Sequence, residues 1–331
     1  MKILVTGGAG YIGSVVTTEL LKAGHEVVVF DNLIRGHRQA LPEAASLVVG
    51  DVNDRESLNQ VFKAHPVEAV MHFAALIEVA ESMKVPEHYY RNNSAGTLTL
   101  LEATLAAGVR KFVFSSTAAL YGNPQRTPIQ EDDQLAPTNA YGDSKFLVER
   151  MLGWMHEIHG LRYASLRYFN ASGAARPDLG EDHSPESHLI PLILKVALGQ
   201  RPTISIFGTD YPTEDGSCVR DYIHVLDLAS AHVLALDALS QSSRLIYNLG
   251  TGQGFSVREV IEVARRVTRH PIPALECPRR PGDPSTLVAS SEKIQKELGW
   301  KPKHSELEHI VLSAWEWHRR HPNGFGDKQE S

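Results

Sequence analysis

Tyr141 and Lys145 are four residues apart in the sequence, at the start of a stretch whose apolar residues recur at helical spacing. Residues four apart on a helix share one face, so the phenol and the ammonium group would be neighbours. A phenol has a pKa near ~10 and is a poor base at neutral pH, but a nearby cation and a helix N-terminus both favour its ionised form. This pair could remove a proton from a hydroxyl group.

A third candidate, Thr117, follows the apolar run Lys111–Ser116, which has the pattern of a buried strand. In open α/β sheets ligands bind at the carboxyl ends of the strands, which is where this hydroxyl would lie. Thr117 could orient the proton that passes between a substrate hydroxyl and Tyr141. Because a tyrosine and a lysine at this spacing also occur by chance on protein surfaces, the interpretation depends on the rest of the site.

Three glycines, Gly7, Gly10 and Gly13, recur at every third residue directly after the strand-like run Lys2–Thr6. Glycine lets the backbone turn tightly and approach a pyrophosphate, which the free N–H groups and the dipole of the following helix then hold. The spacing alone is a weak signal in a chain with 25 glycines. Its position between a strand and an apolar helix makes it a strong indication of a dinucleotide site.

Two aspartates extend this prediction. Asp31 ends the second strand-like run, where a carboxylate accepts the ribose hydroxyls of an adenosine and repels a 2′-phosphate, so NAD is favoured over NADP. Arg35 and Arg38 follow closely and keep NADP as the alternative. Asp51 ends the third run, and it could accept a hydrogen bond from the adenine amine or, alternatively, cap a helix.

The elements that would position these residues alternate between strands and helices. Such alternation predicts an α/β fold with a Rossmann-type doubly wound parallel sheet that helices cover on both faces. The expected strands of the first half are Lys2–Thr6, Glu26–Phe30, Ser46–Val49, Glu68–His72, Lys111–Ser116 and Arg162–Arg167, and the expected helices include Gly13–Ala23, Pro86–Ala107 and Tyr141–His159.

The pattern changes after Asn170, where a stretch rich in Pro, Gly and Asp begins. We predict an NAD-binding Rossmann domain over residues 1–170, to which later segments at about 218–250 return. Residues 171–331 would mainly form a smaller C-terminal α/β substrate lobe. Further strands are expected at Ile204–Phe207, Tyr222–Val225 and Leu245–Leu249.

Composition excludes several classes of protein. The chain of 331 residues is 42% apolar, yet it has no apolar run near the roughly 18 residues that span a bilayer, and the run at Met1–Thr6 is too short for a secretory signal. We therefore expect a cytoplasmic protein without a membrane partner. A net charge of −6 offers no general basic surface for nucleic acid, so any anionic ligand needs a local cluster, for which Arg220, Arg279 and Arg280 are candidates.

Metal and disulfide sites are not predicted either. Cys218 and Cys277 are too few for a disulfide framework. No Cys-x-x-Cys or His-x-x-x-His pair supplies the spacing of metal ligands. We therefore expect no metal.

Several segments together resemble the extended short-chain dehydrogenase/reductase superfamily and, within it, the UDP-glucose 4-epimerase family, over essentially the whole chain. The most specific is the pair of segments from Phe207 to Val225, because most relatives that share the NAD half lack it. The matching segments are Thr6-Gly-Gly-Ala-Gly-Tyr-Ile-Gly13, Asp31-Asn-Leu33, His72-Phe-Ala-Ala75, Tyr89-Tyr90, Asn92-Asn93, Tyr141-Gly-Asp-Ser-Lys145, Arg167-Tyr-Phe-Asn170, Phe207-Gly-Thr-Asp-Tyr-Pro-Thr-Glu-Asp-Gly216 and Val219-Arg-Asp-Tyr-Ile-His-Val225.

The resemblance implies an NAD-dependent isomerase that interconverts UDP-glucose and UDP-galactose through a 4-keto sugar. Tyr141 would be the base, Lys145 would lower its pKa and hold the nicotinamide ribose, and Thr117 would lie beside the sugar O4. The NAD contacts implied are Gly7, Gly10, Tyr11, Ile12, Gly13, Asp31, Asn32, Asp51, Val52, Phe73, Ala74, Ala75, Asn92, Ser115, Tyr141, Lys145 and Tyr168. The UDP-sugar contacts implied are Thr117, Tyr141, Asn170, His188, Leu189, Phe207, Arg220, Arg280, Asp283 and Leu287, with the arginines on the diphosphate.

Three positions depart from the family pattern. Ile77 stands where some members have a lysine near the NAD phosphates. His188 replaces an asparagine that others place on the substrate phosphate, a change that we expect to be tolerated. Leu287 occupies the position that is tyrosine in enzymes of narrow specificity and smaller in broad ones, so the use of UDP-N-acetylglucosamine and UDP-N-acetylgalactosamine stays open.

The two residues after Thr117 weigh against another function on the same fold. A sugar-nucleotide 4,6-dehydratase needs an Asp-Glu pair there, but Ala118 and Ala119 occupy those positions. A non-catalytic NAD-sensing regulator would usually lack the Tyr–Lys pair. The alternative that stays open is another NAD-dependent UDP-sugar enzyme, such as a UDP-glucuronate decarboxylase or epimerase. The resemblance also implies a homodimer through a helix bundle near Trp154 and Met155.

Overall fold

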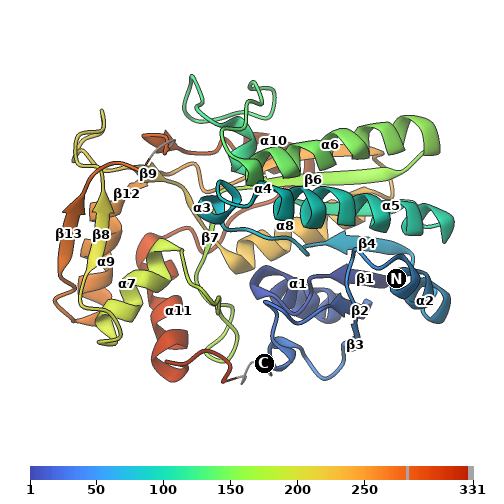
Figure 1. Ribbon diagram of the computed structural model, residues 1–331, viewed down its shortest axis with the longest axis horizontal. Helices are drawn as coiled ribbons and strands as arrows, with labels where there is room; N and C mark the ends of the chain where they lie inside the picture. The colour runs from blue at the N-terminus through green and yellow to red at the C-terminus, as the bar shows by residue number, and fades with distance from the viewer. Residues whose placement is uncertain (281–282, 327–331) are drawn as a thin grey trace.

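A central sheet of seven parallel strands organises the computed structural model, which describes residues 1–280 and 283–326 (Figure 1). The strand order is β11-β6-β5-β4-β1-β2-β3, so it reverses between β1 and β4, and ligands of open α/β sheets bind at such a point. The predicted Rossmann-type doubly wound sheet is thereby confirmed. The strands are β1 Lys2–Thr6, β2 Glu26–Asp31, β3 Ser46–Val49, β4 Ala69–His72, β5 Lys111–Thr117, β6 Arg162–Tyr168 and β11 Arg244–Leu249.

Helices cover both faces of this sheet, which is why its strands read as apolar runs without regular alternation. In β1, Ile3 and Val5 belong to the core under one layer of helices, whereas Leu4 belongs to the core under the other. The first layer contains α1 Tyr11–Lys22 and α8 Val225–Ala238. The second contains α2 Arg55–Ala64, α5 Gly96–Ala106 and α6 Ala140–His159.

The prediction of one regular helix over Pro86–Ala107 is wrong. The structure divides it into α4 Pro86–Tyr89, a π-helix η2 Tyr90–Ala95 and α5, after the short helix α3 Val79–Ser82. The π-helix buries Asn93, whose side chain donates to the carbonyl oxygen of Leu76 and to the hydroxyl of Ser144. This wider turn therefore ties the segment after β4 to the start of α6.

The smaller lobe lies on the left of Figure 1 and has its own apolar core of Ile193, Leu194, Val260 and Ile310 among others. Strand β8 pairs with β13, and β9 lies between β12 and β14. The elements that build it are α7 Leu189–Ala197, β8 Ile204–Phe207, β9 Val219–Arg220, β12 Phe255–Ser256, α9 Val257–Thr268, β13 Ala274–Cys277, β14 Thr286–Leu287 and α11 Leu307–Arg320. Residues 281–282 and 327–331 of the predicted lobe lie outside the described residues.

The chain passes between the two parts several times. Strands β7 Asn170–Ser172 and β10 Tyr222–His224 pair in parallel between them, and the chain then re-enters the large sheet through α8 and β11. The expected strand Tyr222–Val225 ends one residue early because His224 caps α8 by accepting from the N–H of Leu226. Helix α10 Glu292–Leu298 returns as well, since Ile294 packs into the core of the large sheet.

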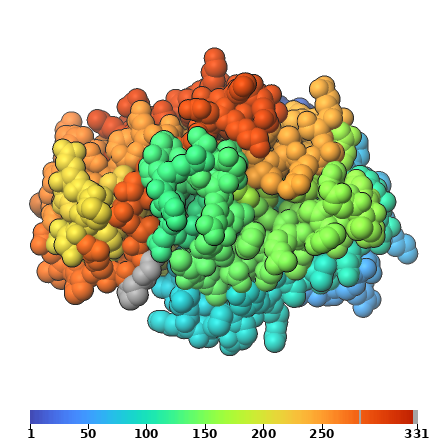
Figure 2. Space-filling view, turned by 90° about the horizontal axis from the view of Figure 1, so that it is seen from above, coloured from blue at the N-terminus to red at the C-terminus, as the bar shows by residue number. Residues whose placement is uncertain are grey.

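The segment after β5 also joins both parts. It contains η3 Ala118–Tyr121 and then extends to Ile129, whose N–H donates to the carbonyl oxygen of Val288 at 2.8 Å and which forms a bridge with Ala289. In Figure 2 this green segment lies between the yellow and orange smaller lobe and α6. Another short helix, η1 Arg38–Ala40, follows β2. Across the described residues, no helix is long and apolar enough to cross a membrane.

Candidate active site

The three predicted catalytic residues come together at the carboxyl end of β5. Tyr141 lies in the first turn of α6, which Asn139 caps by accepting from the N–H of Gly142 at 2.8 Å. The side chain of Thr117, the last residue of β5, lies close enough to the phenol of Tyr141 to affect its pKa. One turn further along α6, Nζ of Lys145 donates to the carbonyl oxygen of Ser115 at 3.0 Å. The structure therefore places a phenol, an alcohol and an amine around one strand end.

Burial dominates the electrostatics of this group. It raises the pKa of Tyr141, and the nearby hydroxyl of Thr117 only partly opposes that effect. It also lowers the pKa of Lys145 to about 7, since an ammonium group loses its hydration in the interior. Nζ of Lys145 also lies over the ring of Phe114, 4.9 Å from its centroid. That Lys145 lowers the pKa of Tyr141 when NAD is bound stays a prediction.

A buried ion pair holds α6 against the strands that carry these residues. Nη2 of Arg167 in β6 lies 2.6 Å from Oε2 of Glu149, and the two side chains are 4% and 6% exposed. The hydroxyl of Ser116 also donates to Glu149 at 2.7 Å. Glu149 was not predicted from the sequence, although it continues the row Tyr141, Lys145, Glu149 at intervals of four and so marks a charged residue on the core-facing side of the helix.

The glycine turn has the shape that a pyrophosphate requires. Gly7 has a φ of +72°, and a Cβ there would collide with the backbone of Ala74. A Cβ at Gly13 would collide with the carbonyl oxygen of Gly7. Gly10 precedes α1 without a side-chain cap, so no side chain competes for the N–H groups of the first turn. The residues present thus fit a dinucleotide phosphate.

The two aspartates play different structural roles. Asp31 is buried, and its two oxygens accept from the backbone N–H groups of Ala9 and Leu33, both at 2.9 Å. A carboxylate has about four acceptor positions, so it can still accept ribose hydroxyls. Asp51 accepts from the side chain of Asn32 at 2.8 Å. The alternative role of Asp51 as a helix cap is wrong, because Asp54 caps α2.

The other predicted cofactor contacts lie along the same edge of the sheet. The side chain of Tyr11 does not point to this edge, because its hydroxyl donates to the carbonyl oxygen of Gly173 at 2.6 Å and is buried. The remaining residues are Ile12 in the first turn of α1, Asn32 after β2, Val52 after β3, Phe73, Ala74 and Ala75 after β4, Asn92 in η2, Ser115 in β5 and Tyr168 at the end of β6. Ser115 and Tyr168 share a hydrogen bond of 2.7 Å between their hydroxyls.

The residues predicted to hold a UDP-sugar gather around β9. The register of β9 with β14 places Arg220 beside Leu287, and the guanidinium of Arg220 pairs with Asp283. Arg280 stacks over the ring of Phe207, with its guanidinium carbon 3.8 Å from the ring centroid.

Backbone contacts connect this group to the catalytic residues. The N–H of Asn170, an exposed residue at the start of β7, donates to the carbonyl oxygen of Asp221, the neighbour of Arg220. Asn170 therefore lies between the carboxyl end of β6 and the arginine-containing strand. A ligand that reaches from Tyr141 to Arg220 would pass it.

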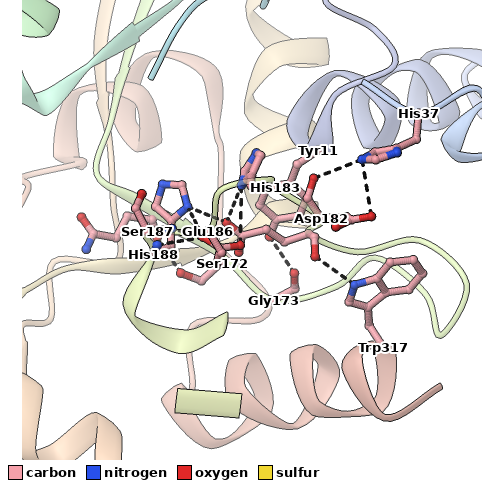
Figure 3. Close-up of polar contacts among 12 residues, drawn as sticks. Tyr11, His37, Ser172, Gly173, Asp182, His183, Glu186, Ser187, His188 and Trp317 are labelled. Carbon is pink, nitrogen blue, oxygen red and sulfur yellow. Dashed lines mark hydrogen bonds and ion pairs between the residues drawn. The ribbon is translucent and has the colours of Figure 1, made fainter. Parts of the chain in front are cut away.

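The loop before α7 contains a feature that was not predicted from the sequence. Nδ1 of His188, which precedes Leu189 and α7, lies 2.8 Å from Oε1 of Glu181 and 3.1 Å from Oε1 of Glu186 (Figure 3). These carboxylates raise the pKa of His188 well above its usual range, although burial opposes them. His183 also approaches Glu181, at 3.2 Å. The alternation of acids and histidines over residues 181–188 could have indicated this group of side chains. It was not predicted because the expectation of no metal rested only on the absence of paired cysteines and of histidines four residues apart.

Known proteins are similar to this chain over its whole length. Residues 3–250 match the NAD dependent epimerase/dehydratase family. A UDP-glucose 4-epimerase from Halalkalibacterium halodurans is 55% identical over 332 residues, which cover 100% of this chain and 99% of that protein. The UDP-glucose 4-epimerase of Stenotrophomonas maltophila, solved with bound NAD and formylated UDP-arabinopyranose, has a TM-score of 0.94 at 41% identity and covers 97% of this chain and 99% of its own. The enzyme of Bifidobacterium longum in complex with NAD⁺ and UDP has a TM-score of 0.94 at 39% identity, with 98% and 100% covered.

Proposed function

Because the chain belongs to the NAD dependent epimerase/dehydratase family, we propose that the site around Thr117, Tyr141 and Lys145 carries out the reaction of the family's UDP-glucose 4-epimerases. The protein is an NAD-dependent isomerase that interconverts UDP-glucose and UDP-galactose. The observation that carries the assignment of residues is that Thr117, Tyr141 and Lys145 lie together at the carboxyl end of β5, on the same edge of the sheet as the glycine turn.

Tyr141 is the base in this proposal. It takes the proton of the sugar O4–H as the C4–O4 bond becomes a carbonyl, and it returns that proton when the alcohol is formed again. NAD supplies the group that accepts the C4 hydride and gives it back, so no net oxidation occurs. Thr117 orients the O4–H toward the phenol, and Lys145 anchors the end of β5 and the nicotinamide ribose.

Inversion at C4 requires that the hydride return to the opposite face of the sugar. The 4-keto sugar must therefore turn over while the UDP part stays anchored. Arg220 and Arg280 suit this anchoring role, because one guanidinium group can bind two phosphate oxygens at once. The ring of Phe207 holds the guanidinium group of Arg280 in place. Tight binding of UDP with loose binding of the hexose lets the intermediate rotate without escaping.

The direct test is conversion of UDP-galactose by purified protein, with Tyr141→Phe as the variant. We expect wild-type protein to form UDP-glucose, and the variant to keep NAD while its turnover falls by at least ~1000-fold, since it lacks the proton acceptor. Tyr247→Phe is the matched control, because that hydroxyl bonds Glu297 away from the site. Absence of UDP-glucose, or release of stoichiometric NADH, would reject the reaction, and an active Tyr141→Phe would reject the base.

The same assay with UDP-N-acetylgalactosamine decides whether Leu287 admits N-acetylated sugars. A side-by-side measurement of CO₂ from UDP-glucuronate separates the reaction from a decarboxylase. Both comparisons use the same purified holoenzyme.

We also propose a homodimer and a cytoplasmic location. Trp154 and Ile158 lie one turn apart on α6 and are 66% and 68% exposed, whereas Met155 packs on the core beneath the helix. An exposed apolar pair of this kind suits a helix bundle between two copies of the chain. Sedimentation at micromolar concentration should show a dimer that Trp154→Glu dissociates. The cytoplasmic location stays a prediction from the sequence.

A further inference from the structure

A group of four metal-ligating side chains, Glu181, His183, Glu186 and His188, lies in the loop that leads to α7. His188 is also an expected contact of the substrate phosphate, whereas the proposed reaction gives the other three no role. One donor atom from each residue lies within 4.8 Å of the donors of the other three. We propose that these four residues form a structural binding site for one divalent transition metal ion of the zinc type. The proposal goes beyond the epimerase reaction and does not depend on it.

The spacing of the donor atoms suits such an ion. Four donors placed ~2.0–2.1 Å from a zinc ion at the corners of a tetrahedron are about 3.3 Å from one another. Here Nδ1 of His188 lies 2.8 Å from Oε1 of Glu181 and 3.1 Å from Oε1 of Glu186. Nδ1 of His183 lies 3.2 Å from Oε1 of Glu181 and 3.9 Å from Oε2 of Glu186. These four distances scatter around the tetrahedral value, with a different oxygen of Glu186 facing each histidine, and the four donors lie within 4.8 Å of one another, so a bound ion would draw them closer together.

The nitrogen of His183 gives an independent indication. Within the described part of the chain, its Nδ1 is one of the few buried side-chain atoms that form no hydrogen bond, although Glu181 is near. An N–H group aimed at the carboxylate would have satisfied it. A lone pair that points to a common centre with the other donors would instead be satisfied by a cation.

The charge of the group also calls for a cation. The carboxylates of Glu181 and Glu186 are only 5% and 2% exposed, so two negative charges lie close together out of water, with a single protonated His188 between them as their partner when no metal is bound. Buried charges are normally paired or bound to metal. A divalent ion bound by two neutral imidazoles and two carboxylates would leave the site neutral, and this donor set is one that zinc accepts.

The position of the loop explains what the ion would do. Figure 3 shows His183 near Tyr11 of the glycine turn, and their rings meet edge to face with centroids 6.2 Å apart. At the other end of the loop, His188 leads into α7 and could use Nδ1 as a ligand and Nε2 for the substrate diphosphate. Four protein donors leave no open position, so the ion would brace the loop between the NAD-binding and UDP-binding parts and would not take part in catalysis.

Titration with zinc chloride tests the proposal. Protein made without a metal-affinity tag and treated with EDTA should bind one Zn²⁺ per chain by calorimetry, and its melting temperature should rise by roughly 5 °C at saturating Zn²⁺. Co²⁺ should give the intense visible absorption of a four-coordinate site. His183→Gln and Glu186→Gln should abolish all three signals.

His309→Gln is the matched control. Nε2 of His309 lies 3.1 Å from Nδ1 of His304 at the surface, so this pair is the competing imidazole site. The proposal predicts that the control variant binds Zn²⁺ as the wild type does. Sub-stoichiometric binding to the wild type, equal binding by His183→Gln, or loss of binding in His309→Gln would overturn it. The first of these outcomes would show a hydrogen-bonded histidine and glutamate network without metal, and epimerase activity in the treated protein would leave the proposed function standing.

Discussion

Replacing Glu149 by leucine should destabilise the protein severely, because it leaves the buried guanidinium of Arg167 without an ion pair, with only the carboxylate of Glu131 beyond ion-pair distance. Arg167 donates to Oε1 of Glu149 through Nε at 3.0 Å and to Oε2 through Nη2 at 2.6 Å. Its other acceptors, the hydroxyl of Tyr121 and the carbonyl oxygen of Glu131, carry no full charge. Removing one partner of a buried pair costs ~3–5 kcal/mol, a large part of the ~5–15 kcal/mol that stabilises a typical native protein.

Urea denaturation followed by circular dichroism measures this loss. With an m-value of about 3 kcal/mol per M, the midpoint should fall by roughly 1–1.7 M. Ser116→Ala is the matched control, since it removes a single hydrogen bond to Glu149 and should cost only about 1 kcal/mol. The double variant Glu149→Leu with Arg167→Met removes both charges and should recover most of the loss.

Two results would refute this reasoning. A loss below ~1 kcal/mol in Glu149→Leu would mean that Arg167 finds another counter-charge or water. A double variant no more stable than Glu149→Leu would mean that packing volume, and not the unpaired charge, decides the stability of α6 on the sheet. The turnover of the folded fraction should fall as well, because Glu149 fixes the helix that carries Tyr141.

Two further predictions concern pH and the glycine turn. Burial lowers the pKa of His72 to about 3, so between about pH 6.5 and 3 only the unfolded chain takes up a proton at this residue. The wild type should therefore lose its advantage in unfolding free energy over His72→Asn as the pH falls through that window, as measured by urea denaturation. An unchanged advantage would show that the folded protein protonates His72 as readily. Gly7→Ala should weaken NAD binding at least ~10-fold in a fluorescence titration, because its Cβ would collide with Ala74, whereas Gly24→Ala, also at positive φ but facing open space, should bind normally. Equal weakening in both variants would contradict this.

Local patterns were sufficient to predict the sheet and the NAD-binding edge. β3 and β8 have the bounds expected from the sequence, and Asp31 ends β2 as predicted. Strand periodicity, glycine spacing and the position of an acid are properties of a few consecutive residues. They can therefore be recognised in the sequence before the fold is known.

Features that depend on contacts between distant segments could not be predicted in this way. The π-helix at Tyr90–Ala95 exists because Asn93 is bonded to the loop after β4 and to α6, and no periodicity records those partners. Burial raises the pKa of Tyr141, and the depth at which α6 is buried could not be deduced from the spacing of Tyr141 and Lys145 on one helix face. Asp54, and not Asp51, caps α2, because the helix begins at Arg55, three residues later than a cap at Asp51 would require.

The late return of the chain to the large sheet has a consequence for biosynthesis. β6 has β5 on one side only until β11, Arg244–Leu249, has left the ribosome, and all of α7 to β10 is made in between. At ~5–20 residues per second, the free edge of β6 is exposed for several seconds in every nascent chain. A message truncated before β11 would leave that edge open permanently, so premature termination in this region should produce aggregates and not a smaller NAD-binding protein.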